Sequence, residues 1–182
     1  MIYLHCYQKN NNIKVASKAL LQQNLSCYLN VDSNDLHIQT NENGKPRTEG
    51  IYFSVSHCRQ IIIQAFSFEG ELGIDVEYKN PNRNFMALAE RYYHAQEFSY
   101  LSTLNHQQAA TVFYNLWTAK EAVCKSQGGR LWLYLADNYL DENYNIQSPF
   151  KGLHIVQLNK LTDYSISLVT QKKPKRVEFI DE

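Results

Sequence analysis

The sequence lacks the features that would point to a membrane protein, a secreted protein or a zinc finger. No apolar run approaches the roughly 20 residues that a membrane-spanning helix needs. The N-terminus "MIYLHCYQKNNN" has no basic start followed by a long apolar stretch, so we see no signal peptide. Its four cysteines (Cys6, Cys27, Cys58 and Cys124) form neither a Cys-x-x-Cys pair nor a zinc-like grouping with histidine. We therefore expect a cytoplasmic protein with reduced thiols and no membrane partner.

The sequence also lacks an excess of charge of either sign. Eighteen basic residues balance 18 acidic ones among 182 residues, so the formal net charge is zero. A nucleic-acid-binding protein usually carries a basic excess, and we therefore expect no nucleic-acid partner. Hydrophobic residues make up 44% and charged residues 20%, which is ordinary for a globular protein. A chain of this length accommodates one domain or two small halves that share a core.

Hydrophobic periodicity predicts a mixture of strands and helices. The expected strands span residues 1–7, 51–57, 61–68, 71–78, 152–159 and 163–171, and the expected helices span 11–30, 84–104 and 107–127. Glu69 and Gly70 are expected to form a tight turn that joins the strands 61–68 and 71–78 in a hairpin. The basic segment "KKPKR" is expected to be a solvated tail. Because strands and helices do not strictly alternate, we predict an α+β fold.

The segment "GIDVE" places two carboxylates on one face of a predicted strand. Side chains alternate along a strand, so Asp75 and Glu77 share a face and lie about 6.6 Å apart. Two hard oxygen ligands at this separation can hold Mg²⁺ together with water or substrate phosphate. On the pattern alone, a solvated face is the more common explanation, because exposed acids are frequent on sheets.

The segment "LWTAKEAVCKSQGG" places an acid and a lysine on one helical line. Phe113, Trp117, Glu121 and Lys125 follow one another at intervals of four residues. Taken alone, Glu121 and Lys125 form an ordinary helix-stabilising ion pair worth about 0.3–0.5 kcal/mol. The small residues around the pair allow close packing, so we expect the pair to be partly buried.

A histidine follows the strand in "FSVSHC". Neighbouring strand residues point to opposite faces, so a nucleophilic dyad of His57 with Ser56 or Cys58 is not expected. A structural role, an anion contact and a general acid–base role all stay open for His57.

Taken in order, these segments resemble the 4'-phosphopantetheinyl transferases of the surfactin-synthetase-activating type. The resemblance rests on "NGKPR", "FSVSHC", "LGIDVEY", "RYYHAQEF" and "FYNLWTAKEAVCKSQGG", which lie between residues 43 and 129. It implies an enzyme that transfers the 4'-phosphopantetheine moiety of coenzyme A to a serine of an apo acyl or peptidyl carrier protein. It further implies dependence on Mg²⁺ and release of 3',5'-ADP.

The resemblance also implies an architecture. The fold would be a pseudo-twofold pair of similar α+β halves, residues 1–71 and 72–182, each with a helix packed on a small antiparallel sheet. Coenzyme A would lie in the cleft between the halves, and the second half would carry the metal site. Two halves in one chain favour a monomer. An inactive module that binds carrier proteins and an unrelated Mg²⁺-dependent phosphohydrolase are the alternatives.

The resemblance carries over residue by residue onto this sequence. The implied metal ligands are Asp75, Glu77 and Glu121. The implied catalytic residues are Glu121, Lys125 and His57, and the candidate base is Glu121 or a metal-bound water that Glu121 orients. The implied coenzyme A contacts are Lys18, Lys45, Ser56, His57 and Lys125. Glu97 matches the acid of the family's middle motif, without an assigned role. The chain departs from the family in its short first half, where the basic and aromatic segment that usually precedes the Lys18 region is not recognisable.

Overall fold

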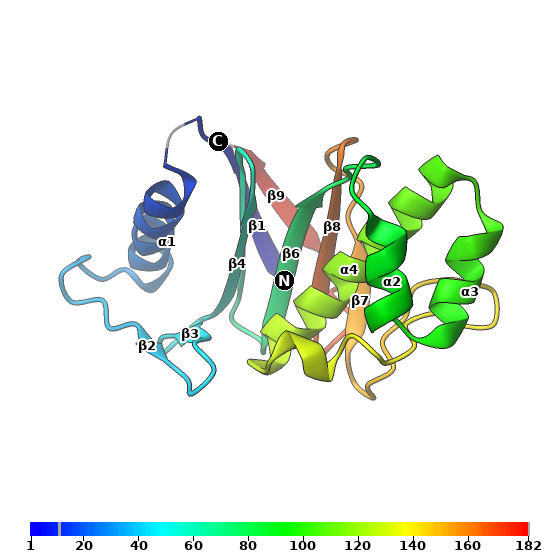
Figure 1. Cartoon of the computed structure of the whole chain (residues 1–182). Coiled ribbons are helices and arrows are strands. Elements are labelled where there is room, and N and C mark those ends of the chain that lie inside the picture. Colours follow the sequence, from blue (N-terminus) through cyan, green and yellow to red (C-terminus); the bar gives the residue numbers. More distant parts are fainter. Residues whose placement is uncertain (11, 182) are drawn as a thin grey trace.

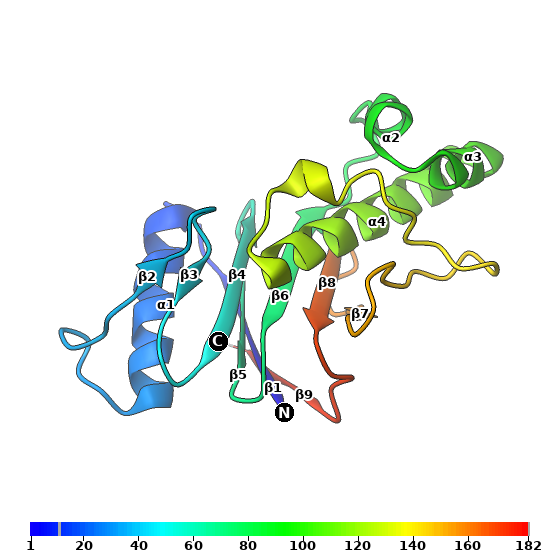
Figure 2. The ribbon, with the colours of Figure 1, turned by 90° about the horizontal axis from the view of Figure 1, so that it is seen from below.

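The protein is built from four layers, as shown by a computed structural model that describes residues 1–10 and 12–181. Helix α1 (Ile13–Leu29) covers one face of a four-stranded sheet, and this sheet packs against a three-stranded sheet (Figure 1; Figure 2). Helix α4 (His106–Gln127) covers the far side of the three-stranded sheet, and helices α2 (Phe85–Tyr92) and α3 (Ala95–Thr103) pack against α4. The predicted α+β fold class is therefore confirmed.

The four-stranded sheet contains a strand that the sequence did not reveal. Its order is β4 (Tyr52–Cys58), β5 (Ile61–Ser67), β1 (Ile2–Gln8) and β9 (Val177–Asp181). The strands β4, β5 and β1 are antiparallel neighbours, and β9 runs parallel to β1. The segment "KKPKR", which we expected to be a tail, is the loop that leads into β9. The chain thus returns from its C-terminal part to the sheet of its N-terminal part.

The expected hairpin between the strands 61–68 and 71–78 is wrong. Strand β5 pairs instead with β4, and the two are joined by a tight turn at Arg59 and Gln60. Arg59 adopts a left-handed conformation, with a φ of 53°. Gly and Asn are the usual residues in this conformation, so the sequence of the turn contained no recognisable hairpin signature. Strand β6 (Leu72–Tyr78) pairs with β8 (Tyr164–Thr170), which also pairs with β7 (His154–Gln157).

The expected single helix over residues 84–104 is interrupted. It splits into α2 and α3 because a capping box starts a new helix at His94. The His94 ring accepts a hydrogen bond from the backbone N–H of Gln96, and the Glu97 carboxylate accepts one from the backbone N–H of His94. No helix in the described ranges is long and apolar enough to cross a bilayer.

A small hairpin caps the end of α4. The short strands β2 (Gln39–Thr40) and β3 (Pro46–Arg47) flank the "NENGK" turn. The side-chain amides of Asn41 and Asn43 donate to the carbonyl oxygen of Gly128 at 3.0 and 2.9 Å, and the Lys45 ammonium donates to that of Ser126 at 3.0 Å. The last carbonyls of a helix have no partners within the helix, so the turn satisfies them and ties the first half of the chain to α4.

The packing of α4 against β6 depends on Gly73. A Cβ atom at this position would lie 2.0 Å from the carbonyl oxygen of Ala122 and 2.6 Å from the backbone nitrogen of Ser126. Leu72, Ile74 and Val76 face the core between the two sheets. The alternate residues of β6 therefore point towards α4, which can approach closely because Gly73 has no side chain.

We predict that Gly73→Ala destabilises the fold. The added methyl group meets the backbone of α4, which cannot move without disturbing the whole layer, so the free energy of unfolding should fall by about 1–3 kcal/mol or more. Urea denaturation measures this change. Gly152→Ala is the control, because a Cβ there meets no atom within 4 Å and the substitution carries only the strain of a positive φ. Equal losses in the two variants would contradict the packing argument.

Candidate active site

The three predicted metal ligands meet at the junction of β6 and α4. Asp75, Glu77 and Glu121 each place one carboxylate oxygen within 4.8 Å of the others. Asp75 is buried, and both glutamates are half-buried. The strand supplies two acids on one face, and the close approach of α4 at Gly73 brings in the third.

The electrostatics of this acid cluster favour a cation. Burial raises the pKa of Glu121 to about 7, and the neighbouring charge of Asp75 adds to this effect. Burial, followed by the charge of Asp75, also raises the pKa of Glu77. One oxygen of Asp75, Oδ2, is buried without a hydrogen-bond partner. Carboxylates that repel one another around an unsatisfied buried oxygen fit a hard divalent cation such as Mg²⁺.

Lys125 lies beside the cluster but does not form the ion pair that the helical spacing suggested. Its Nζ atom donates to Asp75 Oδ1 at 2.7 Å and to Ser56 Oγ at 3.0 Å, whereas no ion pair with Glu121 is found in the described part of the chain. The buried Asp75 carboxylate is the acceptor that most needs a charged partner. Burial alone would lower the pKa of Lys125, but the charges of Asp75, Glu121 and Glu77 outweigh burial and raise it. Lys125 therefore stays cationic.

The two sheets are joined next to this cluster by a ladder of side-chain hydrogen bonds. Alternate side chains of β4 accept hydrogen bonds from alternate backbone N–H groups of β6. The pairs are Ser54 Oγ with Ile74 N at 3.1 Å, Ser56 Oγ with Val76 N at 3.3 Å, and Cys58 Sγ with Tyr78 N at 3.4 Å. Ser56 also donates to Asp75 Oδ1 at 2.8 Å. The ladder thus fixes the position of β4, which carries Ser56 and His57, relative to the acids.

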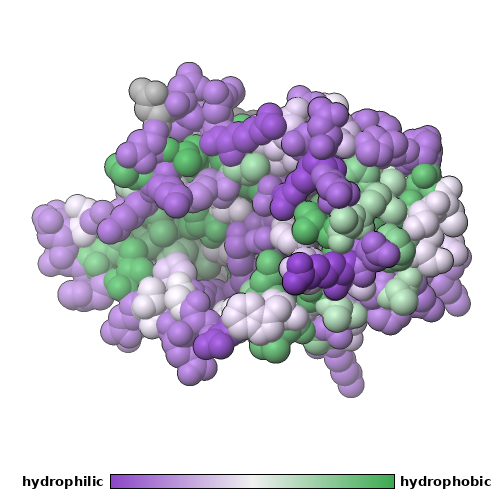
Figure 3. All heavy atoms as spheres, in the orientation of Figure 1, coloured by the Kyte–Doolittle hydropathy of each residue, from purple (hydrophilic) through white to green (hydrophobic). Residues whose placement is uncertain are grey.

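A cleft of about 410 Å³ opens over the acid cluster between α1, β4 and α4. Its walls include almost all of the predicted site residues. The lining residues are Lys14, Ser17, Lys18, Leu21, Pro46, Val55, Ser56, His57, Asp75, Glu77, Glu121 and Lys125. Basic side chains from α1 therefore lie across the cleft from the acids and Lys125. Figure 3 shows that the face presented in Figure 1 is largely hydrophilic, with hydrophobic residues in separate patches.

Lys45 is the one predicted contact that does not line this cleft. Its ammonium group pairs with Glu71 and donates to the carbonyl oxygen of Ser126 at the end of α4. Burial lowers the pKa of Lys45, although the charge and hydrogen bond of Glu71 oppose this effect. The structure thus places Lys45 where the β2–β3 turn contacts the end of α4. The contact of Lys45 with coenzyme A stays a prediction.

Glu97 forms a buried ion pair that the sequence did not reveal. Its carboxylate lies 2.9 Å from Lys120 Nζ, and both side chains are fully buried. Lys120 also donates to the carbonyl oxygens of Leu135 and Asp137, and Glu97 accepts from the backbone N–H of Tyr139 at 2.8 Å. Burial lowers the pKa of Lys120 to about 8, although Glu97 opposes this effect. Because adjacent helical residues point in different directions, Lys120 anchors α4 while its neighbour Glu121 faces the cleft.

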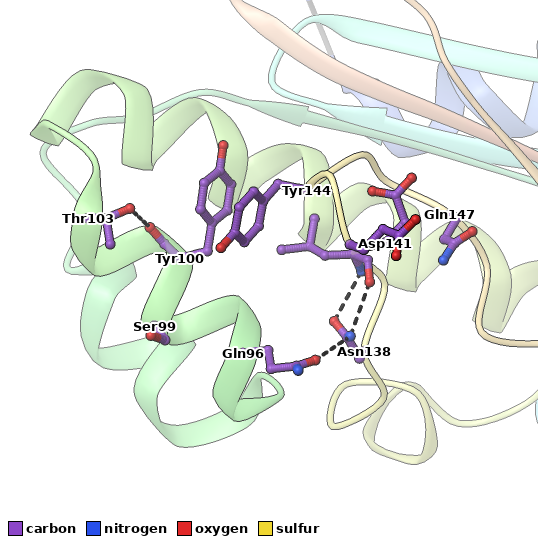
Figure 4. A pocket seen from close by; sticks show the side chains of 10 residues that line it. Gln96, Ser99, Tyr100, Thr103, Asn138, Asp141, Tyr144 and Gln147 are labelled. Carbon is purple, nitrogen blue, oxygen red and sulfur yellow. Dashed lines mark hydrogen bonds between the residues drawn. The ribbon is translucent and has the colours of Figure 1, made fainter.

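Size alone does not identify the site, because two other cavities are larger. One of about 480 Å³ lies between α3 and residues 138–147, where the rings of Tyr100 and Tyr144 stack at 4.1 Å (Figure 4). Its Asp141 carboxylate already accepts backbone hydrogen bonds from Asn143 and Asn145, which lower its pKa. Another, of about 610 Å³, lies between the end of α1 and the β2–β3 hairpin. Neither contains the acid cluster.

Comparison with known proteins identifies the family of this site. Residues 71–175, which span the three acids and Lys125, match the sequence profile of the 4'-phosphopantetheinyl transferase superfamily. The chain belongs to this superfamily. The match begins directly before β6 and includes α4, so it covers the elements that bring the acids together.

Curated members of the 4'-phosphopantetheinyl transferase superfamily match part of the chain. 4'-Phosphopantetheinyl transferase HetI of Nostoc sp. is 29% identical over 119 residues, which cover 62% of this chain and 50% of that protein. 4'-Phosphopantetheinyl transferase Sfp of Bacillus subtilis is 30% identical over 119 residues, covering 64% and 52%. 4'-Phosphopantetheinyl transferase AcpT of Salmonella typhimurium is 33% identical over 94 residues, covering 50% and 49%. The chain spans about half the length of these curated relatives.

In this member of the superfamily, α1 contributes more to the cleft than the sequence indicated. The sequence singled out Lys18, and the structure adds Lys14, Ser17 and Leu21. These positions lie four residues before, one before and three after Lys18, so they belong to one side of the helix. Lys18 indicated which side of α1 would face the cleft, and helical spacing from Lys18 could have found the other three residues.

We predict that Glu121→Gln stabilises the protein in the absence of divalent metal. Removing one charge from the acid cluster relieves repulsion, so in EDTA at pH 8 the free energy of unfolding should rise by about 1 kcal/mol. Mg²⁺ should stabilise the wild type by mass action and should have little effect on the variant. Thermal unfolding with and without Mg²⁺ measures both effects.

Glu90→Gln is the control for this experiment, because Glu90 is an exposed acid on α2 away from the cluster. It should respond to Mg²⁺ like the wild type. A Glu121→Gln variant that is destabilised in EDTA and still gains the full stabilisation from Mg²⁺ would show that Glu121 is not part of a metal site.

We predict that Lys120→Met is strongly destabilising and that Glu97→Gln partly repairs it. The single variant leaves the Glu97 carboxylate buried without its cation, which should cost about 3–5 kcal/mol. In the double variant neither residue of the pair carries a buried charge, so guanidinium denaturation should show a smaller loss than in Lys120→Met. Strictly additive losses would mean that the two residues do not act as a pair.

Proposed function

We propose that the protein transfers the 4'-phosphopantetheine moiety of coenzyme A to a serine of an apo acyl or peptidyl carrier protein, with Mg²⁺, and releases 3',5'-ADP. One observation carries the proposal in a chain of this superfamily: a cleft with three clustered acids and Lys125 on one side, and Lys14, Lys18 and His57 on the other. A diphosphate with a second, distant phosphate is the kind of ligand that such a distribution of charge accommodates.

In the proposed reaction, Asp75, Glu77 and Glu121 hold Mg²⁺. The ion would supply charge neutralisation at the diphosphate oxygens, where negative charge develops during transfer. The unpartnered Oδ2 of Asp75 supports this assignment, because a buried carboxylate oxygen needs either a hydrogen-bond donor or a cation.

The remaining cleft residues orient coenzyme A in this proposal. Lys125, which stays cationic, donates to the phosphate oxygens from a position fixed by Asp75 and Ser56. His57 contacts phosphate from the end of β4, and Lys18 contacts the 3'-phosphate from α1. These contacts position the diphosphate for attack, which is the main contribution a protein makes to phosphoryl transfer.

The nucleophile in this proposal comes from the partner protein. The serine hydroxyl of the carrier must lose a proton as it attacks phosphorus, and the Glu121 carboxylate, on the cleft side of α4, is the proposed base. This explains why the chain needs no serine or cysteine dyad of its own.

In the proposed architecture, the chain forms two similar halves, residues 1–71 and 72–182, which are related by a pseudo-twofold axis. Each half has a principal helix, α1 or α4, against its own sheet, with the coenzyme A cleft between them. Strand β9 belongs to the second half by sequence and pairs with β1 of the first. We further propose that the protein is a cytoplasmic monomer whose partners are coenzyme A and the carrier protein.

The transfer reaction can be tested by intact-mass measurement of the carrier. We expect that protein, coenzyme A, Mg²⁺ and an apo carrier yield a carrier heavier by one phosphopantetheine, together with 3',5'-ADP. Glu121→Gln should lower the rate about 100-fold or more, the usual cost of losing one group that stabilises developing charge. Glu90→Gln should transfer at the wild-type rate.

Two outcomes would contradict the proposed function. Release of inorganic phosphate without any mass gain would indicate a phosphohydrolase. Binding of apo carriers without any mass gain, across fatty-acid, polyketide and peptide carriers, would indicate an inactive carrier-binding module.

A further inference from the structure

A polar side chain occupies the centre of the first sheet, where a hydrophobic one would be expected. Gln64 lies in the middle of β5 and is fully buried. Its neighbours on the same face of the strand, Ile62 and Phe66, are also fully buried. Burying an amide is costly unless its donors and acceptors are satisfied, so the partners of Gln64 show what the residue does.

Both ends of the Gln64 amide bind α1. Its Nε2 donates to the backbone carbonyl of Ser17 at 3.0 Å, and its Oε1 accepts from Asn24 Nδ2 at 2.9 Å. Asn24 Nδ2 also donates to the hydroxyl of Tyr7 on β1 at 2.7 Å. A carbonyl can only accept, so the bond to Ser17 fixes the orientation of the Gln64 amide.

Hydrophobic contacts hold the C-terminal part of α1, where Leu21, Leu25, Tyr28 and Leu29 pack in one cluster, but they do little to fix its first two turns. Over residues 13–29, the buried side chains are Ser17, Asn24 and Leu25, so two of the three are polar. Val15, near the start of the helix, is 62% exposed. Hydrophobic contacts are not directional and permit a helix to slide or rotate, whereas a hydrogen bond to one backbone carbonyl specifies a single height and rotation.

The side of α1 that Gln64 holds is also a wall of the cleft. Lys14, Ser17, Lys18 and Leu21 line the cleft at helical spacing, and the carbonyl of Ser17 is the one that Gln64 binds. Figure 2 shows α1 alongside β4 and β5, with α4 beyond the edge of the sheet. Gln64 itself does not line the cleft.

We propose that Gln64 is a positioning residue that sets the height and rotation of α1, so that Lys14 and Lys18 face the anionic co-substrate. This inference rests on the proposed function. It adds a residue outside the cleft that determines the affinity for coenzyme A. The acids and Lys125 belong to β6 and α4, whereas the hydrogen bonds of Gln64 go to α1. A displaced α1 should therefore weaken the binding of coenzyme A and leave the transfer step unchanged.

Gln64→Leu tests this inference, with Gln22→Leu as a matched control. Gln22 lies on α1 itself, is exposed and donates to the carbonyl of Ser33 at 3.1 Å. We expect Gln64→Leu to raise KM for coenzyme A about ten-fold, since two hydrogen bonds that fix α1 are lost, with kcat within about two-fold of the wild type. Gln22→Leu should leave both constants unchanged. If Gln64→Leu does not fold, Asn24→Leu removes one of the two hydrogen bonds between Gln64 and α1 and leaves the bond to Ser17, so KM should rise by less than ten-fold, again with kcat unchanged.

Combining the variant with Lys18→Ala distinguishes positioning from a general loss of stability. If Gln64 acts through α1, Lys18→Ala should raise KM in the wild-type background and raise it much less in the Gln64→Leu background. A KM that does not change in Gln64→Leu, a loss confined to kcat, or an equal effect of Lys18→Ala in both backgrounds would overturn the inference.

Hydrogen exchange keeps this test separate from that of the proposed function. Amides of residues 13–29 should exchange faster in Gln64→Leu than in Gln22→Leu, while those of β6 and α4 should be unchanged. If the wild type transfers no phosphopantetheine, the proposed function fails, and this measurement alone decides whether Gln64 positions α1. Equal exchange in the two variants would then overturn the inference.

Discussion

The structure depends most on the buried carboxylate of Asp75. One of its oxygens accepts hydrogen bonds from Ser56 on β4 and Lys125 on α4, so a single residue of β6 connects the first sheet, the second sheet and the long helix. Its other oxygen is buried and lacks a hydrogen-bond partner in the described structure. A charge removed from water must be compensated nearby, and the Ser56 hydroxyl and the Lys125 ammonium meet this requirement at one oxygen. The two glutamates of the cluster add negative charge instead of compensating it.

The other contacts around the cleft keep this arrangement in place. The side-chain ladder between β4 and β6 joins two sheets that share no backbone pairing, and the β2–β3 turn holds the end of α4. The buried pair of Lys120 and Glu97 anchors α4 on the side away from the cleft. The acids gain nothing in stability from their proximity and repel one another. Such a cluster is stable only because the surrounding contacts are well satisfied, as is common at functional sites.

Local patterns in the sequence predicted the parts of the structure that depend on neighbouring residues. Alternation along β6 placed Asp75 and Glu77 on one face, and periodicity located α1 and α4. Features that depend on distant contacts were missed or misjudged. These include the pairing of β9 with β1, the hairpin formed by β4 and β5, and the ion pair between Lys125 and Asp75. Helical spacing favoured Glu121 as the partner of Lys125, but an acid 50 residues away needed a cation more.

Anomalous diffraction from crystals grown with Mn²⁺ and coenzyme A tests the central claim most directly. The account predicts a metal peak bounded by Asp75 Oδ2 and the carboxylates of Glu77 and Glu121. It also predicts the coenzyme A diphosphate against this metal and the rest of coenzyme A along the wall formed by α1. Coenzyme A bound in the cleft without metal at these acids, or metal and coenzyme A bound at one of the other cavities, would contradict it.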